Sequence, residues 1–539
     1  MKLTYKSILF AALCGALSLS SCAGDWLETE PTESTSSDGI LASADNVKQA
    51  INGMCKLMTM QHAYYGQGFN GEGTIMLMYG EYTGEDFQFP MYAPGWAIFM
   101  NGTATILHNK NSIYPAYPWY YYYTIIGNAN TILEQIDNAE GDAKEIQFLK
   151  AEALTFRAYA YSMLLQLYCD RWADSNNGTA DGVVLRLDTS MGDMPLSSQA
   201  DCYAQIYKDL DEAIALYKES GLAPNNVFAG AKSDVCFPDL NVAYGVYAKT
   251  ALVKEDYTNA LNYAKLAREN YPLMSNADYK AGFMSPTSEW IWGAFNDEAE
   301  TLYYWSYLVT MAYNGYYAQA YGGTTASSEL IDQAPASDIR KSLFVNKEAF
   351  CEEGQNVSDL INITSDGEFT DEEAYEKANE YAQANCAYTP AEIVYPYTNL
   401  KFACTALPGV GCIPFIRSSE MLLIEAEANY FLHNETAAQQ ALVELNTSTS
   451  RDPEYTCTVT GDDLFNQIVF YRRLELWGEG RSWFDCKRWN RKVVRKGLTE
   501  GGNFHATIAG TFGDDPLFYK WIIPAKETDY NTALGTPGK

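Results

Sequence analysis

Two carboxylates near the C-terminus, Glu479 and Asp485, have the residue types and the close spacing of an acid–base pair. Such a pair can divide the acid and base roles in hydrolysing a glycosidic bond. Because cations flank both carboxylates, ion pairs within the fold explain the cluster more simply than catalysis does. These cations are Arg472, Arg473, Arg481 and Arg488. The sequence therefore favours a structural junction at this place.

A second candidate is a metal-binding loop at residues 174–182, DSNNGTADG, where side-chain oxygens recur at something like calcium-loop spacing. No glutamate closes the loop at its twelfth position, so a plain turn rich in Asn and Asp is the alternative. A zinc site is disfavoured, because the 12 cysteines include no CxxC pair and the 4 histidines include no HxxxH spacing. We therefore expect no cofactor and no metal, with calcium at 174–182 as the one open case.

Helices must position these residues, and helical periodicity is strongest over 144–172. Its apolar side chains form one wide stripe, and alanines line both flanks. Two apolar flanks require two neighbours, which is typical of an inner helix in a stacked array. We expect a helix over 119–136 to pair with it in antiparallel orientation. Further helices are expected at 43–58, 203–217, 241–253, 257–270, 416–432, 436–445 and 463–477.

Two of these expected helix pairs share a repeat spacing. Ala248 and Ala260 lie 12 residues apart, and Ala426 and Ala438 repeat that interval. Small residues at this spacing are typical of the crossing point in a tetratricopeptide repeat, a helix pair that stacks on its neighbours. Two unrelated helical hairpins are the alternative.

Two long regions, 61–118 and 297–400, interrupt the helical pattern and concentrate aromatic residues. Long loops of this kind form either a folded cap or a binding surface. The segment SEWIWGAFN at 288–296 alternates like a short buried strand, so we assign Trp290 and Trp292 to structure. Residues 351–381 carry ten acids against one lysine, which predicts an exposed insertion.

The first 21 residues have the pattern of a lipoprotein leader. Two lysines precede an apolar run over 8–19, and Leu-Ser-Ser-Cys ends at Cys22. The apolar run is too short to span a bilayer. We expect cleavage before Cys22, lipid attachment to its sulfur and a tether over 22–42. An ordinary signal peptide with a chance cysteine is the alternative.

The charge of the chain argues against one class of partner. The formal net charge is −31, and loss of the leader with its two lysines makes it more negative by two. Such a surface repels nucleic acid and anionic lipid. Carbohydrate, which is mostly neutral, remains a compatible ligand.

Six stretches, taken together and in order, resemble a known family. They are 22–32 (CAGDWLETEPT), 148–170, 241–267, 416–430 (IRSSEMLLIEAEANY), 472–490 (RRLELWGEGRSWFDCKRWN) and 523–531 (IPAKETDYN). The chain is similar in these stretches to the SusD/RagB family of surface lipoproteins. One departure is local, since this chain has Ser482 where the family more often has an arginine.

The resemblance implies one mostly α domain over 43–539. About four tetratricopeptide-like helix pairs would form its scaffold, and the long loops would form an irregular subdomain with short strands. The scaffold would comprise mainly 43–60, 119–172, 200–272 and 415–490. The resemblance also implies a function without catalysis. The protein would capture a nutrient, usually a glycan oligomer, at the outer surface of the outer membrane and pass it to a SusC-like TonB-dependent transporter.

The aromatic loops supply the residues that such a function needs. A sugar packs its C–H face on an aromatic ring while polar side chains bond its hydroxyls. We therefore expect residues of the first loop region to meet residues of the second at a ligand site. The candidates are Tyr82, Trp96, Asn101, Tyr313, Tyr316, Tyr317 and Tyr321. For each ring, packing in the core or within a loop is the alternative.

Three other functions stay open from the sequence. The cargo could be a peptide instead of a glycan. A lipoprotein glycoside hydrolase could also combine helices with aromatic loops, and it would need two carboxylates roughly 5–10 Å apart beside those rings. A structural tetratricopeptide adaptor would instead present a concave helical surface to a partner.

Overall fold

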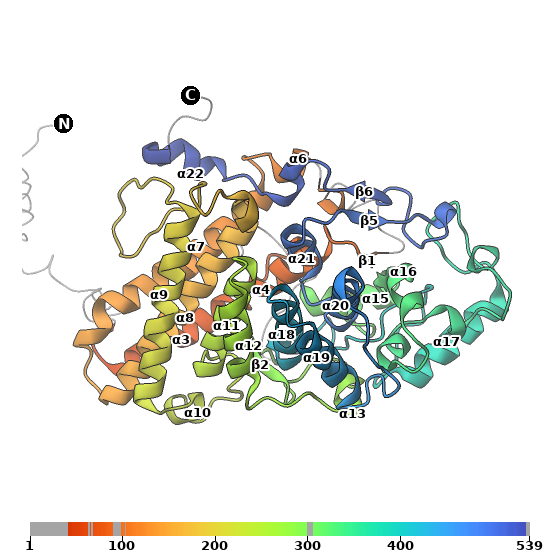
Figure 1. Cartoon of the computed structure of the whole chain (residues 1–539), viewed down its shortest axis with the longest axis horizontal. Helices are drawn as coiled ribbons and strands as arrows, with labels where there is room; N and C mark the ends of the chain where they lie inside the picture. Colours follow the sequence, from red (N-terminus) through yellow and green to blue (C-terminus); the bar gives the residue numbers. More distant parts are fainter. Residues whose placement is uncertain are drawn as a thin grey trace, which may run out of the picture.

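The structure is a computed structural model that describes residues 41–62, 65, 68–89, 99–102, 104–298 and 306–534. The expected leader, Cys22, most of the tether and Trp96 lie outside these residues. Long helices are stacked side by side on the left and in the centre of the molecule, and shorter elements lie on the right (Figure 1). The predicted mostly α fold is therefore confirmed. In the described part of the chain, no helix is both long enough and apolar enough to cross a membrane.

The inner helix of the array is α8, Ala143–Tyr168, as the periodicity predicts. It packs against α7, Ile113–Gln135, and against α9, Gln199–Ser220 (Figure 1). Asp142 caps α8 by accepting hydrogen bonds from the backbone N–H groups of Lys144 and Glu145 at 3.0 and 3.2 Å. Nearly every side chain from Phe148 to Tyr168 is buried, because neighbours cover both flanks.

The second half of the array follows the predicted repeat. In it α11 packs on α12, α12 on α18, and α18 on α19 and α20. Ala248, Ala260, Ala426 and Ala438 are all completely buried, because small side chains let the crossing helices approach closely. These helices are α11 Leu240–Val253, α12 Tyr257–Arg268, α18 Ser418–Phe431, α19 Glu435–Thr447 and α20 Gly461–Glu475.

The N-terminal helix of the described chain is α3, Ala44–Leu57, which packs against α7 and α8. Ser43 caps this helix by accepting a hydrogen bond from the N–H of Asn46 at 3.3 Å.

Three short antiparallel strand pairs join distant parts of the chain. Strand β2, Trp290–Ala294, pairs with β4, Ile413–Arg417, which leads directly into α18. Trp290 and Trp292 are both buried, so their assignment to structure is confirmed. The other two pairs are β1 Phe87–Gln88 with β3 Thr325–Ala326, and β5 Val493–Arg495 with β6 Gly510–Phe512.

The loop-rich region 61–118 contains more helix than the sequence indicates. It includes α4, Gly71–Thr74, a π-helix at Ile75–Glu81 and the first turns of α7, which begins at residue 113 and not at 119. Pro118 lies inside α7 and cannot donate to the carbonyl of Tyr114. The hydroxyl of Tyr79 donates to that carbonyl instead, at 2.6 Å. A tertiary contact thus satisfies the group that the proline leaves without a partner.

The acidic region 351–381 forms a packed element as well as an exposed surface. It includes most of α17, Glu372–Asn385, where Ala374, Ala378 and Ala382 form a buried stripe while the acids face solvent. Several shorter helices complete the described part of the fold. Those used below are α15 Tyr316–Tyr321, α16 Ser328–Gln333, α21 Ser482–Arg488 and α22 Ala525–Tyr530.

Candidate functional site

Glu479 lies in the interior and pairs with two cations. Its carboxylate accepts hydrogen bonds from Arg417 Nη2 and Lys401 Nζ, each at 2.7 Å. Burial raises the pKa of Glu479, but the two cations outweigh burial, so the pKa is lowered overall. This carboxylate is therefore ionised and fully engaged within the fold.

Asp485, the other carboxylate of the sequence pair, is held in the same way. It accepts from Arg472 Nε at 2.6 Å and from Arg488 Nε at 2.7 Å. Burial raises the pKa of Asp485, but the two arginines lower it by a larger amount, so the pKa is lowered overall. A general acid needs a pKa raised toward the working pH, and neither carboxylate has one. Ion pairs thus account for both carboxylates. The flanking arginines supply the partners of Asp485 as predicted, whereas the partners of Glu479, Arg417 and Lys401, come from elsewhere in the chain.

Glu479 belongs to a larger buried network that we call the charge junction. Its members are Glu289, Arg340, Lys401, Arg417, Arg451, Glu475 and Glu479, all at most 3% exposed. Arg417 pairs with Glu289, Glu475 and Glu479, while Arg340 and Arg451 each pair with one or more of the same carboxylates. Because β4 ends at Arg417 and α20 at Glu475, the junction links the strand pair to the helical array.

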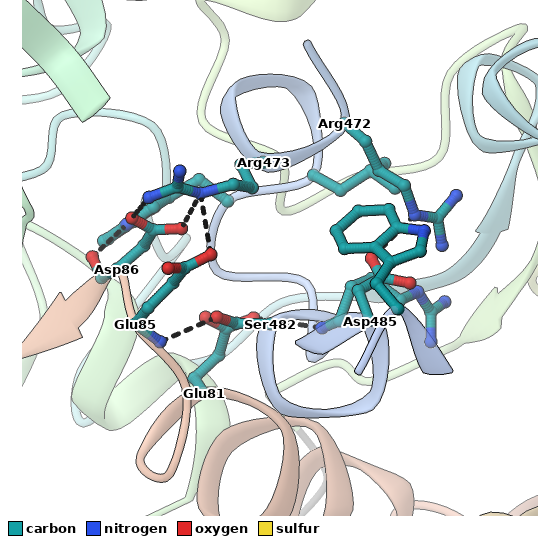
Figure 2. A pocket seen from close by; sticks show the side chains of 11 residues that line it. Glu81, Glu85, Asp86, Arg472, Arg473, Ser482 and Asp485 are labelled. Carbon is teal, nitrogen blue, oxygen red and sulfur yellow. Dashed lines mark hydrogen bonds and ion pairs between the residues drawn. The ribbon is translucent and has the colours of Figure 1, made fainter. Parts of the chain in front are cut away.

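A second polar cluster joins residues 81–86 to α20 and α21, as Figure 2 shows. Asp86 forms an ion pair with Arg473 at 2.7 Å, and Glu85 lies 3.1 Å from the same guanidinium. Ser482, where the family resemblance would favour arginine, accepts a hydrogen bond from the N–H of Glu85 at 2.9 Å. The space between these groups is about 10 Å³. Such a volume has room for about one water molecule and not for a substrate.

Glu81 completes this cluster in an almost fully buried position. Its Oε1 accepts hydrogen bonds from the N–H groups of Gly480 and Arg481 at 2.6 and 3.2 Å. Burial raises the pKa of Glu81 to about 8, although the bond from Gly480 opposes the shift. Gly80 is required here, because a Cβ at that position would collide with the carbonyl of Gly480. The cluster therefore fastens the first loop region to the C-terminal helices.

The loop at 174–182 is closed by its own hydrogen bonds. The carboxylate of Asp174 pairs with Arg171 at 2.7 Å, and Ser175 Oγ accepts from the N–H of Gly178 at 2.8 Å. Asn176 adopts a left-handed conformation with φ 51°. These are features of a tight turn. Among the residues that the structure describes, no group of acids, cysteines and histidines is placed to hold a metal ion.

The two aromatic loop regions meet, as the sequence analysis expects. Strand β1 of the first pairs with β3 of the second, and the ring of Phe89 packs on Tyr317 with 5.2 Å between centroids. Tyr82, Tyr313 and Tyr317 are only 1, 2 and 4% exposed. A ring without an exposed face cannot stack on a sugar, so these three tyrosines serve as packing residues here.

The remaining candidates lie closer to solvent. Asn101 is half-buried and donates from Nδ2 to the carbonyl of Thr507 at 2.8 Å. Tyr321 is also half-buried, and its ring contacts Tyr317. Tyr316 is 39% exposed. Trp96 lies outside the described residues, so its role stays a prediction.

Tyr316, Tyr388 and Leu407 are large side chains exposed on segments that hydrogen bonds connect, and we call this set the aromatic surface. Tyr388 is 42% exposed and Leu407 54% exposed. The N–H of Tyr316 donates to the carbonyl of Pro408 at 2.9 Å, and the N–H of Tyr388 donates to the hydroxyl of Tyr313 at 3.1 Å. Buried Tyr313 thus connects the turn before α15 to the segment that carries Tyr388. Hydrogen bonds thus hold together three segments, distant in sequence, that carry these exposed side chains.

Two family models match this chain. One, described as "SusD family", matches residues 293–534, and the other, described as "Starch-binding associating with outer membrane", matches residues 25–222. The chain belongs to the SusD/RagB family. Membership places it among carbohydrate-binding proteins associated with the outer membrane. A search of curated proteins finds no match.

Solved structures of SusD-like proteins share the whole fold. A SusD-like carbohydrate-binding protein from Bacteroides vulgatus has a TM-score of 0.70 at 22% identity, covering 92% of this chain and 98% of its own. A SusD superfamily protein from the same species has a TM-score of 0.68 at 21% identity, with coverage of 92% and 99%. One from Bacteroides thetaiotaomicron has a TM-score of 0.65 at 19% identity, with coverage of 91% and 99%. These likenesses show that this SusD-like chain has the complete family fold.

Sequence reasoning missed two residues of the aromatic surface in this SusD-like protein. Tyr388 lies in a polar segment, between Cys386 and Pro390, and Leu407 precedes another proline. Both are within or beside the loop region 297–400. A signal was available, because an isolated large apolar residue within two positions of a proline in a loop has no helix or strand to bury it.

Proposed function

We propose that this SusD-like protein is a surface lipoprotein that binds a glycan oligomer at the aromatic surface and passes it, unchanged, to a SusC-like TonB-dependent transporter. The observation that carries the proposal is the exposure of Tyr316 and Tyr388 on segments that hydrogen bonds hold together. Aromatic faces of this kind stack on sugar rings. Family membership supports the ligand class. The engagement of Glu479 and Asp485 in ion pairs supports the absence of catalysis.

A pair of alanine variants tests the site. We expect Tyr316→Ala combined with Tyr388→Ala to weaken oligosaccharide binding about tenfold or more in calorimetry, because each lost stacking contact contributes about 1 kcal/mol. The probes are neutral oligosaccharides of maltose, cellobiose, mannose and xylose units. Tyr530→Ala is the matched control, since Tyr530 is 79% exposed on α22 and should leave binding unchanged. Unchanged affinity in the double variant would remove the aromatic surface from the proposal.

The same preparation separates the rival functions. A peptide library tested in parallel would support peptide cargo if it bound while every oligosaccharide failed. Incubation with the bound oligosaccharide should release no reducing ends. Release that depended on Glu479 or Asp485 would establish a hydrolase instead.

The membrane anchor and the partner are tested separately from the ligand. Cys22→Ala should abolish incorporation of labelled palmitate and release the protein from the outer membrane, because acyl chains supply the attachment. The anchored protein should co-purify with a TonB-dependent transporter. Normal membrane attachment of Cys22→Ala would contradict the lipoprotein part of the proposal.

A further inference from the structure

A groove outside the aromatic surface runs along the outer face of α20. Its floor is that helix face, and its walls are the loop at 452–459 and residues 333–337 at the end of α16. Figure 1 shows α20 beside α16, where the groove lies. Its volume of about 690 Å³ falls within the range of roughly 300–1,000 Å³ that is typical of small-molecule sites. None of its lining residues belongs to the aromatic surface. We call it the α20 groove.

The lining of the α20 groove has a consistent chemistry. Gln333, Asn466 and Gln467 contribute side-chain amides, and Asp463 and Glu454 contribute carboxylates. Amides and carboxylates together donate to and accept from sugar hydroxyls. No lysine or arginine is among the lining residues. Because the fixed charges are all negative, the groove suits a neutral polyol and repels an anionic sugar.

An aromatic cluster forms the apolar part of the groove. Phe470 is half-buried and contacts Tyr471 edge-on, with ring centroids 5.0 Å apart. Tyr455 contacts the other side of Tyr471 with centroids 4.9 Å apart at 79°. The partly exposed ring of Phe470 therefore offers an apolar surface next to the amides, as sugar recognition requires.

The walls of the α20 groove are held in place before any ligand binds. The hydroxyl of Tyr455 donates to Gln467 Oε1 at 2.7 Å, which leaves Nε2 of this amide as the donor toward the groove. The loop is fixed at both ends, because the N–H of Asp452 donates to Asn446 and Gln439 donates to the carbonyl of Val459, both at 2.8 Å. A preformed groove loses little conformational entropy on binding.

We propose that the α20 groove is a second binding site for a neutral oligosaccharide, in addition to the aromatic surface. The ligand class rests on the proposed function, whereas the location and the preference for a neutral sugar rest on the groove itself. Two sites on one anchored protein bind a long polymer more tightly than either site binds a short oligomer, provided that one chain reaches both.

The test counts binding sites by calorimetry with maltoheptaose, cellohexaose, mannohexaose and xylohexaose. We expect two sites per chain for the oligosaccharide that binds. Asn466→Trp, which fills the groove from an exposed position, should reduce the count to one. Gln440→Trp, at an exposed position on α19, is the matched control and should keep both sites. The double variant of Tyr316 and Tyr388 should retain the site in the groove.

Each result decides between the two proposals. A single site that the Tyr316 and Tyr388 variants abolish, and that Asn466→Trp leaves intact, would overturn the α20 groove but keep the proposed function. Binding of no oligosaccharide by the folded wild-type protein would overturn both. Hexagalacturonic acid, an anionic sugar, should compete poorly for the groove. If it competed as strongly as a neutral oligosaccharide does, the preference for a neutral ligand would be overturned. Thermal melting of each variant checks that it is folded.

Discussion

The charge junction and the aromatic surface are both built from side chains that can do chemistry, yet the fold uses them in opposite ways. In the charge junction, Glu475 and Arg417 are at most 1% exposed and form an ion pair with each other. In the aromatic surface, Tyr316 and Tyr388 are about 40% exposed on segments that hydrogen bonds hold together. A reactive residue type thus indicates function only where the fold leaves it accessible to a partner.

The largest loss of stability among the variants that compare these two regions should come from the charge junction. Arg417→Met leaves buried carboxylates without their central cation, so we expect it to lower the free energy of unfolding by about 3–5 kcal/mol. Urea denaturation measures this change. Lys110→Ala is the control, because its pair with Asp529 is exposed and contributes about 1 kcal/mol or less. A loss below about 1 kcal/mol in Arg417→Met would show that the junction does not hold the fold together.

A pH-dependent effect should come from Glu81, the buried carboxyl beside the junction. Its pKa is about 8 in the folded protein, against an ordinary value of 4.5. Between these values the folded state keeps a proton that the unfolded state has lost. The contribution of Glu81 to stability is therefore greatest below pH 4.5 and decreases as the pH rises toward 8.

Glu81→Gln tests this effect while keeping the Oε1 acceptor for Gly480 and Arg481. We expect the variant and the wild type to be similarly stable near pH 5, and the variant to be more stable at pH 8 by on the order of 3 kcal/mol. Urea denaturation at both pH values measures the difference. Equal pH dependence of the two proteins would show that Glu81 ionises normally.

Substitutions in the aromatic surface, unlike those in the charge junction, should leave the stability of the fold nearly unchanged. Removing the rings of Tyr316 and Tyr388 should change the free energy of unfolding by no more than about 0.5 kcal/mol for each exposed position. Tyr82→Ala should instead cost about 3–5 kcal/mol, since its ring is 1% exposed and packs on Phe87. Denaturation of the three variants compares them directly. A large loss of stability in Tyr316→Ala would show that the Tyr316 ring serves to pack the fold and not to bind a ligand.

The periodicity of apolar residues within single segments predicted most of the long helices and one strand of this fold. The stripe over 144–172 and the alanines at Ala248 and Ala260 each describe which face of one helix is buried. The alternation at 288–296 predicted the strand, although both of its faces are buried. The flanking arginines also predicted that Glu479 and Asp485 form ion pairs. Arg472 and Arg488 do pair with Asp485, but the partners of Glu479 are Arg417 and Lys401, which the local pattern did not indicate. Such patterns work because a helix or strand fixes where its own side chains point.

Loop residues could not be assigned in this way, because their burial depends on partners far along the chain. Tyr317 is buried against Phe89, which belongs to the other loop region, and nothing in its own sequence neighbourhood distinguishes it from exposed Tyr316. Helix α7 continues through Pro118, and the distant hydroxyl of Tyr79 donates to the carbonyl of Tyr114 that the proline leaves without its usual partner. The sequence therefore predicted a binding region on the loops but could not select the exposed rings within it.

A small loss of stability should come from breaking the ion pair in the loop at 174–182, which resembles the pairs of the charge junction but is exposed like the aromatic surface. Asp174 is paired like the junction residues, but its side chain is 55% exposed, so solvent screens the pair with Arg171. Asp174→Asn should therefore cost about 1 kcal/mol or less, and millimolar calcium should leave the melting temperature of the wild type unchanged. Binding of calcium to the folded state would raise that temperature in proportion to the logarithm of its concentration. A calcium-dependent rise that Asp174→Asn abolished would make this turn a metal site and Asp174 a ligand, not a screened ion-pair partner.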